Sequence, residues 1–185
     1  MSDALTVPDA DRVAATVAAG LRDVPDFPGP GVVFKDITPL LADARSFATV
    51  VAALADLARS TGATAVAGIE ARGFMLAAPA AERAGLGFWP VRKAGKLPAP
   101  VLRREYALEY GTAALELSAG RAGAGERVLV VDDVLATGGT ARAACELLEE
   151  AGAEVVALAV LLELGFLQGR PQLGDRAVVA LHVES

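Results

Sequence analysis

Two adjacent carboxylates, Asp132 and Asp133, stand between a run of apolar residues, Val128–Val131, and a short loop rich in glycine and threonine. The apolar run is typical of a strand buried on both faces of a parallel sheet, and we expect this strand to end at the carboxylates. In open α/β sheets, ligands bind beyond the carboxyl ends of such strands. Carboxylates at that edge can accept hydrogen bonds from the hydroxyls of a sugar, or hold a metal ion through water.

The loop that follows has the composition of a phosphate site. It consists of Ala136, Thr137, Gly138, Gly139 and Thr140. Glycines let backbone N–H groups approach a phosphate closely, threonine hydroxyls add donors, and the helix predicted from residue 141 directs its positive end toward the anion. A plain strand–turn–helix with solvated acids is the alternative. The whole string of residues 128–140 favours a sugar-phosphate site.

Size and composition indicate one domain. A chain of 185 residues suffices for a single hydrophobic core. Its apolar residues make up 54% of the sequence, but they are not gathered into the ~20 consecutive positions that a membrane span needs. The N-terminal segment is acidic and lacks the basic region that begins a signal peptide. We therefore expect neither a signal peptide nor a membrane partner.

Charge and cysteine content limit the partners further. A net charge of −6 argues against a surface that binds nucleic acid. The one cysteine, Cys145, cannot form an internal disulfide, which fits a cytoplasmic location. The 17 basic residues include only three lysines, Lys35, Lys93 and Lys96, and these fall in two short segments. A local basic cluster of this kind is enough to bind a nucleotide.

Helix and strand patterns alternate along the chain. Apolar spacing predicts helices over 9–21, 43–60, 74–84 and 141–150, and strands over 65–69, 86–91, 113–117, 128–131, 154–162 and 177–183. Such alternation is typical of a doubly wound, mostly parallel sheet. Residues 94–112 lack a core pattern and have the composition of a hairpin, so they form either a functional lid or a loop without a role. Cys145, His182 and Trp89 lie on predicted helix or strand positions and are interpreted as structural.

Five segments together resemble the adenine branch of the type I phosphoribosyltransferase family. Residues 128–140 match the family's signature for phosphoribosyl diphosphate (PRPP). Residues 27–40 resemble the family's base-binding stretch, and residues 68–74 resemble its diphosphate loop. Residues 91–98 and 106–111 resemble the opening and returning parts of its flexible loop. The resemblance implies an α/β fold with a mostly parallel central sheet flanked by helices. It further implies a single domain over 1–185, a base-binding hood over about 1–40 and a flexible catalytic loop over 94–112.

The resemblance also implies an activity. Members of this branch transfer the 5-phosphoribosyl group from PRPP to N9 of adenine, giving AMP and diphosphate in purine salvage. They use Mg²⁺, which we expect to be bound through PRPP rather than directly by protein ligands, and they act as cytoplasmic homodimers. Two alternatives remain. One is a regulator that senses PRPP, and the other is a sister enzyme that uses guanine, hypoxanthine, xanthine or orotate.

The resemblance assigns the ribose and its 5′-phosphate to Asp132, Asp133 and the loop 136–140. The residues assigned to the diphosphate are Arg72, Arg92, Lys93, Lys96 and Tyr110. Guanidinium and ammonium groups at the end of a strand suit an anionic leaving group. The alternatives are that Arg72 pairs with Glu70 at the surface and that the other basic residues form a solvated face.

Glu109 is the expected catalytic residue, together with Arg72. A carboxylate on a closing lid can accept the proton that leaves N9 of adenine. The adenine-binding residues are expected to be Val33, Phe34, Lys35 and Leu164. Relatives carry arginine at the position of Lys35. Because an ammonium cannot make the bidentate contacts of a guanidinium, we do not expect Lys35 to make such a contact. Phe34 can also serve as a core anchor, and Glu109 and Tyr110 as ordinary hairpin residues.

Overall fold

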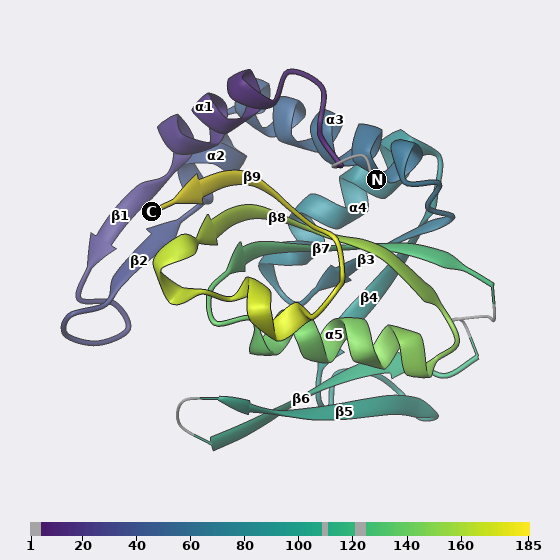
Figure 1. Ribbon diagram of the computed structural model, residues 1–185. Helices are drawn as coiled ribbons and strands as arrows, with labels where there is room; N and C mark the ends of the chain where they lie inside the picture. The colour runs from purple at the N-terminus through teal and green to yellow at the C-terminus, as the bar shows by residue number, and fades with distance from the viewer. Residues whose placement is uncertain (1–4, 109–110, 121–124) are drawn as a thin grey trace.

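A seven-stranded sheet with helices on both faces forms the centre of the computed structural model, which describes residues 5–108, 111–120 and 125–185 (Figure 1). The sheet consists of β3 (Ala65–Ile69), β4 (Gly87–Lys93), β5 (Val101–Leu108), β6 (Gly111–Ser118), β7 (Arg127–Leu135), β8 (Glu154–Leu164) and β9 (Val178–Glu184). The helices are α1 (Ala10–Gly20), α2 (Thr38–Ala42), α3 (Ala44–Ser60), α4 (Arg72–Ala84) and α5 (Gly139–Glu150), with short 3₁₀ turns η1 (Gly165–Leu167) and η2 (Arg170–Leu173). A separate two-stranded sheet pairs β1 (Arg22–Pro25) with β2 (Val33–Asp36).

The strand order is β5-β6-β4-β3-β7-β8-β9. The run from β4 to β9 is parallel, whereas β5 and β6 form an antiparallel hairpin on the β4 edge. Helices α1, α3 and α4 cover one face and α5 covers the other (Figure 1). The predicted mostly parallel α/β fold is therefore confirmed.

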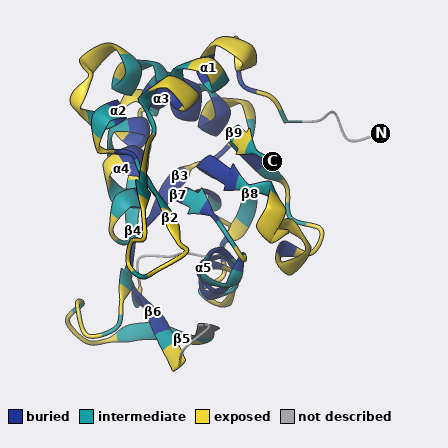
Figure 2. Cartoon of the chain, turned by 90° about the vertical axis from the view of Figure 1, so that its left-hand side faces the viewer, coloured by how far each residue is buried: buried dark blue, intermediate teal, exposed yellow. Residues whose placement is uncertain are grey.

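The unbroken apolar run 128–131 lies in the central strand β7, which is covered by helices on both faces. Val128 and Val130 pack toward α5, while Leu129 and Val131 pack toward α3 and α4, and all four are fully buried. Figure 2 shows the same concentration of buried residues in the inner strands and the inward faces of the helices. Where β7 is covered on both faces and paired on both sides, from Val128 to Val131, it has no position for a polar side chain.

One boundary in this region differs from the expectation. The strand does not end at Asp132 but continues to Leu135, because pairing with β8 extends to that residue. Pairing with β3 stops at Val131. The carboxylates thus lie on a part of β7 that has lost its neighbour on one side, which opens that side for a ligand.

A segment rich in proline and glycine, residues 26–32, joins the two strands of the β1–β2 hairpin. Pro25 ends β1, and its register partner is Val33 at the start of β2. Sequence patterning missed both strands, because each is only four residues long and neither contains a fully buried residue. Phe27 and Phe34 make an edge-to-face contact at 5.1 Å between ring centroids, which links the loop to β2.

Residues 94–112 contribute most of the β5–β6 hairpin, which sequence patterning placed only in part. Strand β5 has three consecutive charged residues, 103–105, at its centre and therefore shows no alternating pattern. Its pairing with β6 runs from Val101↔Ser118 to Leu108↔Gly111. Arg104 attaches the hairpin to α5 through an ion pair with Glu146, at 2.7 Å between Nη2 and Oε2. None of the helices in the described part of the chain has the length and apolarity needed to cross a membrane.

A close helix–strand contact in this fold gives a first prediction. A Cβ at Gly68 of β3 would lie 2.7 Å from the Cβ of Ala77 on α4 and 2.9 Å from Cε2 of Phe88. Gly68→Ala should therefore lower the free energy of unfolding by about 1–3 kcal/mol, as overpacked cores do. Urea unfolding measures this change. Gly87→Ala is the matched control, because nothing lies within 4 Å of a Cβ there; equal midpoints for both variants would contradict the packing argument.

Candidate functional site

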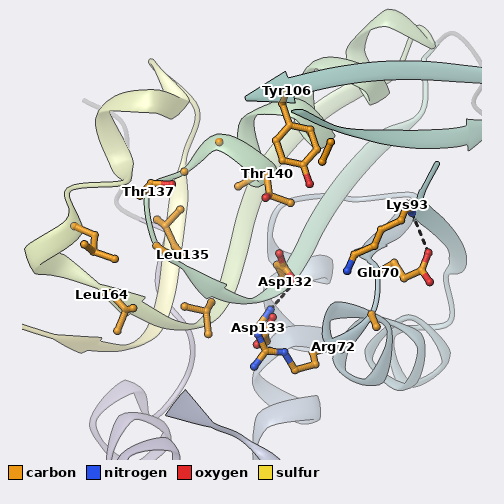
Figure 3. Close-up of a pocket in the computed structure, with 18 of the residues that line it drawn as sticks. Glu70, Arg72, Lys93, Tyr106, Asp132, Asp133, Leu135, Thr137, Thr140 and Leu164 are labelled. Atoms are coloured by element: carbon orange, nitrogen blue, oxygen red, sulfur yellow. Dashed lines mark hydrogen bonds and ion pairs between the residues drawn. The ribbon is translucent and has the colours of Figure 1, made fainter. Parts of the chain in front are cut away.

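A cavity of about 970 Å³ opens at the carboxyl ends of β3, β4, β7 and β8 (Figure 3). Strands β3 and β7 are neighbours, but the helices that follow them, α4 and α5, pack on opposite faces of the sheet. Such a switch point leaves a crevice between the two strand ends, where open α/β sheets bind ligands. The expected site residues from β2, β7 and the following loop all line this cavity.

The loop Ala136–Thr140 forms one wall of the cavity. Gly138 has φ +88° and caps α5, which begins at Gly139 rather than at the expected residue 141. A Cβ at Gly138 would lie 2.4 Å from the carbonyl oxygen of Gly169, so only glycine fits. The first N–H groups of α5 have no partners within the helix, and they face the cavity with the positive end of the helix dipole. This wall can therefore bind a phosphate.

The adjacent carboxylates form the floor. Oδ1 of Asp132 accepts a hydrogen bond from the N–H of Asp133 at 2.9 Å, and Asp133 is buried. Burial and the charge of Asp133 raise the pKa of Asp132 well above its usual range. Burial also raises the pKa of Asp133, although the charge of Arg72 opposes that shift. Hydroxyl groups of a sugar are suitable partners, because they donate hydrogen bonds to carboxylates without adding charge.

Arg72 begins α4 and lies between the two carboxylates on the cavity floor and the β1–β2 hairpin. Its Nε is 2.9 Å from Oδ2 of Asp133, and its guanidinium carbon lies 4.9 Å from the centroid of the Phe34 ring (Figure 3). Its ion-pair partner is thus Asp133, not Glu70, which excludes the alternative weighed from the sequence. Within the described structure, Arg72 Nη1 is buried without a hydrogen-bond partner, and Asp133 Oδ2 has only its ion pair with Arg72 Nε. Buried polar atoms of this kind usually mark a place where a ligand or water binds.

The basic residues at the end of β4 and just beyond it divide into two groups. Lys93 lines the cavity, and its backbone N–H donates to Glu70 at 2.9 Å (Figure 3). Arg92 and Lys96 are not among the lining residues; Arg92 Nε lies 3.2 Å from Glu70, and its Nη1 donates to the Lys96 carbonyl at 3.1 Å. The Arg92 guanidinium lowers the pKa of Glu70 and keeps it ionised. Of the four basic residues expected at the diphosphate, the structure brings Arg72 and Lys93 to the cavity, but not Arg92 and Lys96.

The other end of the cavity is largely apolar. Val33, Phe34 and Lys35 on β2 and Leu164 at the end of β8 all line it, as expected for a base site. The ammonium of Lys35, however, is paired with two carboxylates, Asp23 and Glu184. An aromatic ring and a leucine that line the same cavity suit a flat heterocycle.

Known proteins share this arrangement. The model of the phosphoribosyl transferase domain family matches residues 38–178. An adenine phosphoribosyltransferase from Kineococcus radiotolerans is 87% identical over the full length of both chains. The chain belongs to the adenine phosphoribosyltransferase family. The crystal structure of the enzyme from Thermoanaerobacter pseudethanolicus is 44% identical, with a TM-score of 0.89 over 92% of this chain and 99% of that chain. The enzyme from Saccharomyces cerevisiae, solved with an imino-altritol bisphosphate and adenine, is 35% identical, with a TM-score of 0.87 over 92% of this chain and 99% of that chain.

Sequence reasoning missed one wall of this phosphoribosyltransferase cavity. Tyr106 of β5 projects into it near Thr140 (Figure 3), and Arg103 and Glu105 also line it. Tyr106 stood within a segment that carries the family resemblance, but no spacing rule indicated which face of the hairpin would turn inward. Glu109 and Tyr110, the expected catalytic and diphosphate residues, lie outside the described residues.

The raised pKa of Asp132 gives a second prediction for this phosphoribosyltransferase. At a pH below the pKa that Asp132 has in the unfolded chain, its carboxyl is protonated in both the folded and the unfolded state. At a higher pH the carboxyl ionises readily only in the unfolded state, so Asp132 lowers the free energy of unfolding as the pH rises. Asp132→Asn should therefore raise the free energy of unfolding at pH 7 and have no effect near pH 3.5. Urea unfolding across this pH range measures the difference.

Asp43→Asn is the control with the opposite sign. The N–H of Ser46 donates to the Asp43 carboxylate at the start of α3 and lowers its pKa, so this charge stabilises the fold at neutral pH. The Asp43 variant should lose stability as the pH rises, where the Asp132 variant gains it. The same pH trend in both variants would contradict the assignment.

Proposed function

We propose that this chain transfers the 5-phosphoribosyl group of PRPP to N9 of adenine, giving AMP and diphosphate. The observation that carries the proposal is one cavity with a phosphate-binding loop, two carboxylates beside it and an apolar end lined by Phe34 and Leu164. These parts follow the order phosphate, ribose and base in a nucleoside monophosphate. The identity to adenine phosphoribosyltransferases over the full chain supports the choice of base.

The phosphate and ribose are bound by groups with complementary chemistry. The N–H groups at the start of α5 and the hydroxyls of Thr137 and Thr140 bind the 5′-phosphate. Asp132 and Asp133 accept hydrogen bonds from the ribose 2′- and 3′-hydroxyls. Arg72, through its unpartnered Nη1, and Lys93 bind the diphosphate.

Adenine lies between Phe34 and Leu164. The ring of Phe34 stacks on one face of the base, and the leucine packs on the other. The backbone of Val33 is placed to bond the polar edge of adenine, because Val33 belongs to the same strand and lines the same cavity. The yeast relative binds adenine together with an imino-altritol bisphosphate, which supports adenine as the base.

The reaction forms a bond from N9 to C1′ and breaks the bond from C1′ to the diphosphate oxygen. Positive charge develops on the ribose as the diphosphate leaves with the bonding electrons. Asp132 and Asp133 stabilise that charge more in the transition state than in the ground state. Glu109, which belongs to the segment between β5 and β6, accepts the proton from N9. Its role, and that of Tyr110 beside the diphosphate, are proposals from the sequence.

Mg²⁺ enters with PRPP in this proposal. Among the described residues no three acidic, histidine or cysteine side chains are grouped as a metal site, while the cavity offers a carboxylate pair and phosphate donors. Mg²⁺ binds substrate phosphates and water readily, and on the diphosphate it would neutralise charge on the leaving group. Asp132 and Asp133 would contact its water shell.

The family resemblance also supports a cytoplasmic homodimer. We propose that a basic residue among Arg92, Lys93 and Lys96 reaches the site of the partner subunit, which would explain basic residues outside the cavity of their own chain. The single, buried Cys145 is consistent with a reducing compartment. Sedimentation equilibrium of the purified chain tests the dimer.

Turnover of different bases tests the proposal directly. With PRPP and Mg²⁺, adenine should be converted to AMP and diphosphate, whereas guanine, hypoxanthine, xanthine and orotate should react at least about 100-fold more slowly, because a polar edge with the wrong donors leaves buried groups unpaired. Product formation is measured by chromatography. PRPP binding without turnover of any base would indicate the regulatory alternative instead.

Two substitutions separate the halves of the site. Asp133→Asn should raise KM for PRPP about 10-fold or more, because it weakens charged hydrogen bonds to the ribose, and should change KM for adenine little. Phe34→Ala should raise KM for adenine by up to about 10-fold through the lost stacking contact. Steady-state kinetics measure both constants. If Asp133→Asn raised mainly KM for adenine and Phe34→Ala mainly KM for PRPP, the assignment of the two halves would be wrong.

A further inference from the structure

Lys35 carries a buried charge at the edge of the base site. Its side chain is only 10% exposed, and its ammonium lies 2.8 Å from Oδ1 of Asp23 and 2.5 Å from Oε1 of Glu184. Asp23 is the register partner of Lys35 in the β1–β2 hairpin. Glu184, by contrast, ends β9 at the edge of the central sheet. The Lys35–Glu184 pair therefore connects the hairpin to the central sheet.

The two ends of this connection adjoin the two sides of the base site. Lys35 follows Phe34 directly on β2, and Glu184 is the register partner of Leu164 on β8. Phe34 and Leu164 both line the apolar end of the cavity. The separation between the ring and the leucine thus depends on how β2 is held against β8 and β9.

We propose that Lys35 and Glu184 are positioning residues whose ion pair sets the distance between Phe34 and Leu164, and with it the affinity for the purine base. The inference rests on the proposed function, because it takes the apolar end of the cavity as the base site. It assigns the Lys35 charge to holding β2 in place rather than to contact with adenine.

Three physical points support this role. A two-stranded hairpin has little stability of its own, so its contacts with the rest of the fold decide where it lies. Burial lowers the pKa of Lys35, but hydrogen bonds from its ammonium to Asp23 and Glu184 raise it above the ordinary value, so the charge is kept at neutral pH. Removing either charge breaks the only one of the two Lys35 ion pairs that reaches the central sheet, because the pair with Asp23 stays within the hairpin.

Kinetics of the full-length chain distinguish positioning from general stability. Lys35→Met and Glu184→Gln should each raise KM for adenine about 10-fold, while KM for PRPP stays within about twofold of wild type. The double variant should resemble the single ones, because the same contact is lost in each. Lys35→Arg keeps a cation opposite Glu184 and should restore most of the affinity for adenine.

Glu149→Gln is the matched control. Glu149 pairs with Arg176 at 2.6 Å, and its side chain is 38% exposed against 33% for Glu184, but it lies outside the cavity. This variant should keep both KM values. If Lys35→Met and Glu184→Gln leave KM for adenine unchanged, or raise KM for PRPP equally, the positioning role is wrong.

Calorimetric titration with AMP separates this inference from the proposed function. A wild-type chain that turns over no base would refute the proposed function, and the variants can still be compared by their AMP affinity. A loss of about 10-fold in Lys35→Met and Glu184→Gln, but not in Glu149→Gln, supports the positioning role. Equal affinities in all variants overturn it. Far-UV circular dichroism tests whether each variant is folded. If Lys35→Met does not fold, the milder substitution Glu184→Gln still tests the positioning role.

Discussion

Two carboxylates on consecutive residues, largely withdrawn from water at the end of the central strand, impose the main constraint on this structure. Their mutual repulsion and desolvation raise the pKa of Asp132, so the fold must supply a positive group nearby. Arg72 supplies it at 2.9 Å from Asp133. It can do so because α4 starts against β7, where a Cβ at Gly73 would lie 2.8 Å from the Val131 carbonyl oxygen.

The phosphate loop depends on a second close approach. A Cβ at Gly169 would lie 2.3 Å from the carbonyl oxygen of Ala136, so the segment after η1 packs directly against the loop. That segment is held by Arg170, whose guanidinium binds the buried carboxylate of Glu163 at 2.7–2.9 Å. The loop therefore has fixed backbone on the side away from the ligand. Donors that are already in place bind a phosphate without a further entropy cost.

Much of the central sheet and of the phosphate and ribose half could be predicted, because both depend on local patterns. The buried run 128–131, the acid pair and the glycine-rich loop lie within thirteen consecutive residues, and β3 matches its predicted bounds of 65–69. The β1–β2 hairpin could not be predicted, because strands of four residues without a fully buried side chain carry no periodic signal. The Lys35–Glu184 pair joins residues 149 positions apart, and sequence spacing contains no information about such a contact.

The same distinction explains why Arg92 and Lys96 were expected in the cavity. A run of basic residues after a strand indicates an anion site, but the pattern does not determine which side chain turns inward. In β4, alternation directs the Lys93 side chain to the cavity, and the Glu70 carboxylate binds the Arg92 guanidinium. Pairing of this kind depends on β3 and β4 being neighbours, which is a property of the strand order and not of either segment.

The two halves of the site therefore rest on different kinds of support. The proposed ribose and phosphate half belongs to strands buried on both faces, so a change there also alters the stability of the sheet. The proposed base half belongs to β2, none of whose four residues is fully buried and whose place depends on contacts such as Lys35 with Glu184. A change in those contacts can alter the choice or affinity of the base while leaving the central sheet intact. Specificity and stability are thus separable in this fold, because the groups that distinguish bases lie outside its main core.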